Sequence, residues 1–329
     1  MRGSAMHPVE TRSSRFITRL LVSGVALLLA AAPSASAQPP TEKLVVFGTS
    51  LSDPGNAFAL VGGTNTPPDY LVHPFFLTPN APYTRGGHHF SNGPTWIEQL
   101  ARTLRANVNA EPAFKGDNPR AMNFAIGTSR AREDGINPSL TLQVNTFLQA
   151  TGGVASPNAL HAIEMGSNDV RDALTAGPGA GAVLSSALTA IGTNVATLYA
   201  AGARRFLIWN VPNPALTPAI RFLNSPQMSA GATLVTTTFN QGLDGQITLL
   251  RATLPGIDIV KLDVFQLLNM VVANPAGFGF TNVITPCITP SEAPFFCQTP
   301  DEYLFWDGIH PTTAMHGFVA QFAELALGN

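Results

Sequence analysis

Four short segments, far apart in the chain, contain the residue types that acyl transfer through a serine requires. They are residues 48–52 (GTSLS), 123–127 (NFAIG), 166–169 (GSND) and 307–311 (DGIHP). Such chemistry needs a nucleophilic hydroxyl, a base, a group that orients the base, and donors placed where an oxyanion forms. The segments supply a serine, two donors, and a histidine with a carboxylate, so together they predict a hydrolytic site.

The elements that would position these segments follow the pattern of a parallel α/β fold. Short apolar runs predict strands, and apolar residues spaced three and four apart predict the helices between them. The expected strands are residues 43–47, 121–125, 160–165, 205–211 and 257–262, and the expected helices are 94–104, 181–200, 230–254 and 312–327. We therefore expect a three-layer α/β/α sandwich with a five-stranded parallel sheet.

The candidate residues are placed consistently within this fold. Ser50 follows the first expected strand, Gly127 the second and Asn168 the third, while His310 lies just before the last helix. Ligands of open α/β sheets bind beyond the carboxyl ends of the strands, where these loops would converge. The spacing also lets Asp307 and His310 share one turn.

The first 37 residues have the features of a secretory signal peptide. Arg12, Arg15 and Arg19 precede an apolar run over residues 20–32, and Ala-Ser-Ala at 35–37 fits a cleavage site. A membrane anchor is the alternative, but a run of about a dozen residues is short of the roughly 20 that span a bilayer. We expect a signal peptide over 1–37, one hydrolase domain over 38–329, a secreted or periplasmic location, and no stable membrane span after cleavage.

The charge and the cysteines of the mature chain narrow its function classes. Without residues 1–37, 14 basic and 19 acidic residues give a net charge of −5, which is unfavourable for binding nucleic acid. Cys287 and Cys297 are an even number of cysteines in an exported protein, which favours a disulfide over a metal site. A pair of buried thiols is the alternative.

Three longer segments resemble the GDSL or SGNH hydrolase family, in particular its secreted bacterial esterase and lipase branch. Residues 46–56 (VFGTSLSDPGN) are similar to the first block of the family, 90–96 (FSNGPTW) to a segment common in this branch, and 303–312 (YLFWDGIHPT) to the last block. With the GSND segment, the blocks occur in family order over most of the mature chain. The resemblance implies a flavodoxin-like fold and cleavage of carboxylic esters.

The resemblance also implies a role for each candidate residue. Ser50 would be the nucleophile, His310 the general base, and Asp307 the group that orients His310. The oxyanion hole would consist of the backbone N–H groups of Ser50 and Gly127 and the side-chain amide of Asn168. No metal or organic cofactor is implied, the partner is an ester substrate, and we expect a monomer.

Simpler structural roles exist for several of these residues. Ser50, Ser52 or Asp53 could cap a following helix, and this fits Ser52 and Asp53 better than Ser50. Gly127 could mark only a tight turn, and Asn168 or the adjacent aspartate only a helix N-cap. Their joint placement after successive strands favours the catalytic interpretation. The α/β-hydrolase fold is disfavoured because no Gly-x-Ser-x-Gly occurs.

One departure from the family pattern leaves alternative functions open. The first block usually has aspartate where this chain has Thr49, and a threonine can replace a carboxylate as acceptor only in part. A lipid- or glycan-binding protein with an impaired site is therefore one alternative. Independently of Thr49, an acyltransferase is another, because it would use the same acyl-enzyme and differ only in the nucleophile that reaches it. A second departure, Thr-Ser-Arg after Gly127, leaves the pocket wall near Arg130 open.

The substrate pocket is expected to be built from two irregular stretches, residues 67–89 and 277–296. Their apolar residues Phe75, Phe76, Leu77, Phe295 and Phe296 suggest an acyl-binding surface, or else a cover over the core. The loop closed by Cys287 and Cys297 precedes residues 307–310 closely. We therefore expect the disulfide to help fix the segment that carries the histidine.

Overall fold

The computed structural model describes residues 43–60, 88–288 and 297–328. The chain divides into two compact units, Met1–Gln38 and Pro39–Asn329, and every described residue belongs to the second unit. The expected signal peptide lies outside the described residues.

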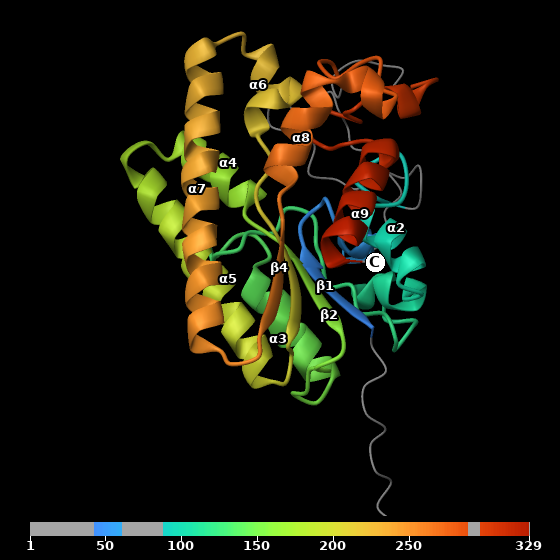
Figure 1. Cartoon of the computed structure of the whole chain (residues 1–329), viewed down its shortest axis with the longest axis vertical. Coiled ribbons are helices and arrows are strands. Elements are labelled where there is room, and N and C mark those ends of the chain that lie inside the picture. The colour runs from blue at the N-terminus through green and yellow to red at the C-terminus, as the bar shows by residue number, and fades with distance from the viewer. Residues whose placement is uncertain (1–42, 61–87, 289–296, 329) are drawn as a thin grey trace, which may run out of the picture. The chain divides into compact units, whose positions relative to one another are not determined.

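A parallel sheet lies at the centre of this unit (Figure 1). Its strands are β1 (Leu44–Gly48), β2 (Leu160–Glu164), β3 (Arg205–Trp209) and β4 (Asp258–Leu262), hydrogen-bonded in that order. The pairing aligns their carboxyl ends, since Gly48 lies opposite Glu164 and Trp209 opposite Leu262. The loops that follow the strands therefore emerge at one edge of the sheet.

The prediction of a fifth regular strand at residues 121–125 is wrong. The segment lies beside β1 and exchanges hydrogen bonds with it, from Val46 N–H to the Met122 carbonyl (2.9 Å) and from Phe124 N–H to the Val46 carbonyl (2.8 Å). A single bridge, Val46 with Asn123, pairs it to β1. On the other side of the segment, the Asn56 side-chain amide donates hydrogen bonds to the carbonyl groups of Asn123 and Ala125 (2.8 Å each). Gly48 N–H, which would pair with the Phe124 carbonyl in a continuing ladder, donates to the Gln143 side chain instead (2.9 Å). Within the described residues the sheet therefore has four strands.

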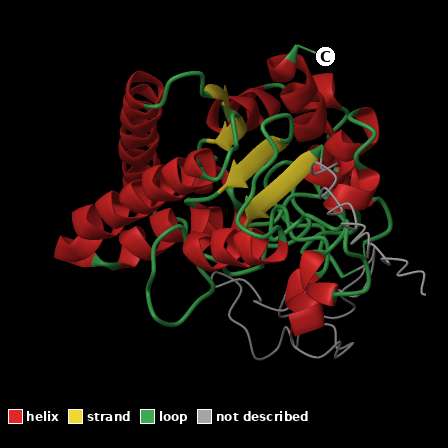
Figure 2. Ribbon diagram, turned by 90° about the horizontal axis from the view of Figure 1, so that it is seen from below, coloured by secondary structure: helices red, strands yellow, loops and turns green. Residues whose placement is uncertain are grey.

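Helices cover both faces of the sheet, which confirms the three-layer sandwich (Figures 1 and 2). In Figure 1, α5 and α7 lie to the left of the sheet and α2 and α9 to the right. The helices in the described residues are α1 (Asn56–Leu60), α2 (Trp96–Thr103), α3 (Leu140–Ala150), α4 (Ser167–Thr175), α5 (Ala180–Ala200), α6 (Pro218–Phe222), α7 (Pro226–Thr253), α8 (Val264–Ala273) and α9 (Thr313–Leu327).

Side-chain caps define where most of the longer helices begin. Ser139, Ser225, Asp263 and Thr312 each accept a hydrogen bond from the backbone N–H three residues further on, at the starts of α3, α7, α8 and α9. Such caps satisfy N–H groups that have no partner inside the helix, and each contributes roughly 1 kcal/mol. The cap at Thr312 also fixes where the chain leaves the loop of residues 307–311, which contains His310 and is called the histidine loop below.

The alternation of side chains along β1 divides the core into two clusters. Val45 and Phe47 pack with α3, α5 and α7 on one face, while Leu44 and Val46 pack with α2, α8 and α9 on the other. Successive residues of a strand point to opposite faces, so a strand buried on both faces is apolar throughout. This explains why the sheet was recognisable from short apolar runs.

Within the described residues, the segment Gly177–Ala200 is long and apolar enough to cross a membrane, judged by length and composition. It contains α5, whose side chains Leu184, Ile191, Val195 and Leu198 pack in the core cluster with α3 and α7. A core helix of this kind has the same composition.

Candidate active site

Ser50, His310 and Asp307 form a continuous hydrogen-bonded chain at the carboxyl edge of the sheet. Ser50 Oγ lies 2.8 Å from His310 Nε2, and His310 Nδ1 lies 2.7 Å from Asp307 Oδ2. Ser50 retains 9% of its surface, His310 3% and Asp307 none. Ser50 is therefore the most exposed of the three residues, and the Asp307 carboxylate is buried behind the imidazole. This is the relation that proton transfer from a serine requires.

The backbone of the histidine loop holds Asp307 in one orientation. Its Oδ1 accepts hydrogen bonds from the N–H groups of Ile309 and His310 (2.8 Å each), which leaves Oδ2 for the imidazole. Trp306 N–H donates to the His310 carbonyl (2.7 Å) and closes the turn. One turn therefore both fixes the Asp307 carboxylate through backbone N–H groups and places it against the His310 imidazole.

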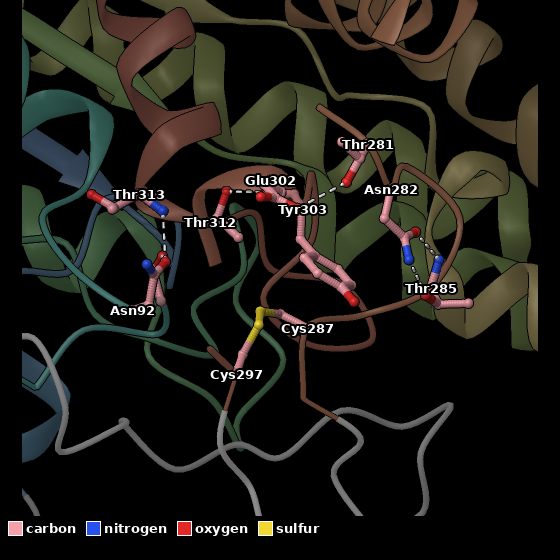
Figure 3. Close-up of a disulfide and its surroundings, with 11 residues drawn as sticks. Asn92, Thr281, Asn282, Thr285, Cys287, Cys297, Glu302, Tyr303, Thr312 and Thr313 are labelled. Atoms are coloured by element: carbon pink, nitrogen blue, oxygen red, sulfur yellow. Dashed lines mark hydrogen bonds between the residues drawn. A yellow bond between two sulfur atoms is a disulfide. The ribbon is translucent and has the colours of Figure 1, made fainter. Parts of the chain in front are cut away.

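The disulfide between Cys287 and Cys297 is confirmed, with Cα atoms 5.5 Å apart. Figure 3 shows it beside Tyr303 and Thr312, close to the histidine loop. Cys287 N–H donates to the Phe305 carbonyl, and the next residue, Ile288, donates to the Trp306 carbonyl (2.9 Å each). The disulfide loop is therefore hydrogen-bonded to the two residues that precede Asp307.

The segment 90–96 supports the histidine loop from the other side. Ser91 Oγ donates to the Pro311 carbonyl, and Asn92 Oδ1 accepts from Thr313 N–H (2.8 Å each), as Figure 3 shows for the second bond. The Phe90 ring lies 5.4 Å from the His310 ring, centre to centre. The segment 90–96, which resembles the family, therefore supports the histidine loop.

The turn that carries Ser50 is anchored by two buried side chains that the sequence reasoning did not identify. Gln143 of α3 accepts from Gly48 N–H and donates to the Gly48 carbonyl (2.9 Å each). Glu164, the last residue of β2, accepts from Thr49 N–H (2.9 Å) and from the Thr49 hydroxyl (3.0 Å to each carboxylate oxygen). These contacts fix the end of β1 directly before Ser50.

Glu164 explains how the turn accommodates Thr49. The threonine does not have to act as the hydrogen-bond acceptor in this turn, because the Glu164 carboxylate accepts from both the N–H and the hydroxyl of Thr49. Glu164 also accepts from Ser52 Oγ (3.1 Å), which in turn accepts from the Trp96 indole N–H (2.9 Å). Burial raises the pKa of Glu164 from 4.5 to about 7, against the opposing effect of its hydrogen bonds to Thr49 and Ser52. A glutamate at the end of a fully buried strand was the available signal.

Gly127 lies against Asp53 and Phe90. Its N–H donates to Asp53 Oδ2 (2.8 Å), and a Cβ at this position would approach the Phe90 ring to 2.3 Å. Asp53 accepts three further N–H groups at the start of α1, from Gly55, Asn56 and Ala57. Burial nevertheless raises the pKa of Asp53 to about 6. Asp53 therefore has the capping role considered for it, and it also holds Gly127.

Asn168 lies at the start of α4 with its side chain at the site. The N-cap of α4 is Gly166, with a φ of 113° that favours glycine, and no side chain caps this helix. Asn168 Nδ2 donates to the Ser129 carbonyl (2.9 Å), which uses one of its two amide hydrogens. Asp169 instead accepts from Ala131 N–H (2.8 Å). Neither residue is the N-cap.

A cavity of about 140 Å³ opens at Ser50 and His310. Its walls in the described part of the chain come from α4, the segment after β3, α8 and α9, and are mostly apolar. They include Leu174, Val211, Pro212, Pro214, Ala219, Ile220, Val264, Leu268, Met315 and Val319. The expectation that residues 67–89 and 277–296 build the walls missed these elements. Phe75, Phe76, Leu77, Phe295 and Phe296 lie outside the described residues.

Arg130, which the sequence left open as part of the pocket wall, is paired elsewhere. It donates to both carboxylate oxygens of Asp172 (2.9 and 3.0 Å) and retains 8% of its surface. Among the described residues, no group of three or more histidine, cysteine, aspartate or glutamate side chains could hold a metal ion.

Comparison with known proteins agrees with this geometry. Residues 44–323 match the family model described as GDSL-like Lipase/Acylhydrolase. GDSL esterase/lipase LIP-4 of Arabidopsis thaliana is 26% identical over 94% of this chain and 92% of its own length. Phosphatidylcholine-sterol acyltransferase of Aeromonas hydrophila is 25% identical over 92% of this chain and 93% of its own. Thermolabile hemolysin of Vibrio parahaemolyticus is 25% identical over 85% of this chain and 62% of its own.

Proposed function

Because the chain belongs to the GDSL-like lipase/acylhydrolase family, we propose that it is a secreted serine hydrolase that cleaves carboxylic esters through an acyl-enzyme on Ser50. The observation that carries the proposal is the hydrogen-bonded chain from Ser50 through His310 to Asp307 at the mouth of an apolar cavity. An ester with an apolar acyl chain fits such a cavity.

In the acylation step, His310 Nε2 takes the proton of Ser50 Oγ as the oxygen attacks the ester carbonyl. The carbonyl oxygen becomes an oxyanion, and collapse of the tetrahedral intermediate expels the alcohol, which receives the proton from His310. Asp307 accepts the Nδ1 hydrogen and stabilises the imidazolium between these transfers. Water then attacks the acyl-enzyme by the same route, with His310 as base, and releases the acid and free Ser50.

The oxyanion is proposed to bind the Ser50 N–H, the second amide hydrogen of Asn168, and Gly127 N–H. The removal of one such donor typically lowers the rate by about 100-fold or more. The hydrogen bond from Gly127 to Asp53 bears on this set, because the oxyanion would have to share that N–H with the carboxylate. Of the three donors, the Asn168 amide is the side chain that lines the cavity beside Ser50.

Acyl transfer to an alcohol is a second candidate, favoured by the similarity over 92% of the chain to a protein named phosphatidylcholine-sterol acyltransferase. Both reactions use the same acyl-enzyme and differ in the nucleophile that resolves it. A binding protein with an impaired site is less well supported, because Glu164 supplies the carboxylate that Thr49 lacks.

The proposed location is outside the cytoplasm, after removal of residues 1–37 as a signal peptide. The disulfide between Cys287 and Cys297 is consistent with an oxidising compartment. The mature chain, residues 38–329, is proposed to act as a monomer with an ester as its partner.

The test is hydrolysis of p-nitrophenyl esters from acetate to palmitate by the mature protein and its Ser50→Ala variant. We expect Ser50→Ala to lower kcat by at least about 10⁴-fold, as for other serine nucleophiles. Ser186→Ala, on the exposed face of α5, is the matched control and should retain wild-type turnover. Equal turnover by Ser50→Ala and wild type would refute the proposal. Product analysis with an added alcohol would separate transfer from hydrolysis.

A further inference from the structure

One face of α4 forms a wall of the catalytic cavity. Asn168, Arg171 and Leu174 all line it, at intervals of three residues. Residues three apart on a helix lie on the same side, so these side chains follow one another away from Ser50. The rise of about 1.5 Å per residue places Arg171 about 4.5 Å along the helix from Asn168. Arg171 therefore lies one helical turn from the Asn168 amide on the same cavity wall.

Arg171 differs from the two other arginines near this helix. Arg130 and Arg132 both form ion pairs with Asp172, at 2.9 and 2.7 Å. Within the described part of the chain, the Arg171 guanidinium has no hydrogen bond or ion pair, although the residue is half-buried. Burial and the charge of Arg130 lower the pKa of Arg171, and the smaller attraction of Asp172 opposes this only in part.

No acidic side chain among the described residues lines the cavity, and Arg171 is the only side chain there with a permanent charge. The N-terminal end of α4, where Ser167 and Asn168 lie, adds partial positive charge of the same sign. The cavity thus combines apolar walls with an uncompensated cation close to the nucleophile. Such a charge is costly to bury unless a partner neutralises it.

We propose that Arg171 binds an anionic oxygen group of the ester substrate, a carboxylate or a phosphate, beside the scissile bond. This inference rests on the proposed ester hydrolysis and names its substrate class: an ester that is apolar over most of its length and carries one negative charge. The guanidinium suits such a group because its N–H donors can engage two oxygens at once.

The test compares kcat/KM for pairs of esters in which one member carries a single anionic group and the other does not. The first pair is mono-p-nitrophenyl adipate and p-nitrophenyl hexanoate, which places the anion on the acyl side. The second is hexanoylglycerol phosphate and monohexanoylglycerol, which places it on the alcohol side. The readout is the ratio of anionic to neutral kcat/KM for wild type, Arg171→Met and Arg171→Lys.

We expect Arg171→Met to lower this ratio by about 10-fold or more on at least one pair, as for loss of a charged hydrogen bond. Arg171→Lys should restore part of it, and added salt should lower the wild-type ratio. Arg205→Met, at the exposed start of β3, is the matched control and should leave the ratio unchanged. The pair that responds identifies the side of the ester that carries the anion.

Two failures are distinguishable. An unchanged ratio for Arg171→Met and Arg171→Lys on both pairs, with neutral esters still hydrolysed, overturns the inference alone. A lack of Ser50-dependent turnover on every ester overturns the proposed function and this inference with it. Should Arg171→Met fail to fold, Arg171→Lys and the salt dependence of the wild-type ratio decide the question.

Discussion

A second carboxylate at position 49 is predicted to destabilise the protein in a pH-dependent way. The Thr49 hydroxyl lies 3.0 Å from both carboxylate oxygens of Glu164, which is completely buried. Thr49→Asp would therefore place two carboxyl groups in contact where the wild type has a donor and an acceptor. Two ionised carboxylates about 3.5 Å apart would repel by roughly 5 kcal/mol at an effective dielectric constant of 20.

In Thr49→Asp, one of the two carboxyl groups will retain a proton. The free energy needed to keep that proton determines how much stability the variant loses. Burial already raises the pKa of Glu164 to about 7, so near neutral pH the proton costs little. Above that pH the native variant holds a proton that the unfolded chain has released. Its stability relative to wild type should then fall by about 1.4 kcal/mol per pH unit, or about 3 kcal/mol between pH 7 and 9.

Urea denaturation of wild type, Thr49→Asp and Thr49→Asn between about pH 6 and 9 measures this effect. The asparagine variant has nearly the same shape as the aspartate but no charge, so its difference from wild type should not depend on pH. An equal loss of stability in Thr49→Asp and Thr49→Asn at pH 9 would refute the reasoning. It would mean that Glu164 and residue 49 do not interact electrostatically.

Two further predictions concern the supports of the site. Burial raises the pKa of Glu164 from 4.5 to about 7, so the contribution of Glu164 to stability is greatest below pH 4.5 and is lost as the pH rises through 7. In urea titrations, the difference in unfolding free energy between wild type and Glu164→Gln should therefore fall by about 3 kcal/mol over this range. A difference that does not change with pH would exclude the effect. Replacement of Cys287 and Cys297 by serine should lower the unfolding free energy by about 2 to 3 kcal/mol in the chain-entropy model. It should also lower kcat for p-nitrophenyl esters, because the loop bonds to Phe305 and Trp306; unchanged kcat well below the melting temperature would separate the disulfide from the site.

The sequence was sufficient to predict elements whose signal is local. Strands buried on both faces are short apolar runs, and β1 to β4 were located to within a few residues for this reason. The prediction for residues 121–125 failed because the Gly48 N–H, which would continue the ladder with this segment, donates to the Gln143 side chain instead. That competition depends on a residue 95 positions from Gly48, which no local pattern reveals.

The candidate site divides in the same way. Ser50, Asp307 and His310 were identified because their segments carry recognisable blocks, and the structure brings them within hydrogen-bond distance. Gln143 and Glu164 were missed because a polar residue in a helix or strand has no sequence signature for the loop it binds. Glu164 was the more accessible of the two, since an acid in a fully buried strand requires a partner.

These contacts show how the site is organised before substrate binds. Glu164 and Gln143 hold the end of β1, Asp53 holds Gly127, and Asp307 is fixed by its own loop. Each bond joins a side chain to a backbone N–H, and Asp307 is the one side chain among these that also belongs to the proposed triad. Preorganised donors of this kind reduce the reorganisation that the transition state would otherwise require. The same logic makes Arg171 the exception, because in the described part of the chain it alone reaches the cavity as a permanent charge without such a partner. No described side chain neutralises this cation, so we expect the substrate to do so.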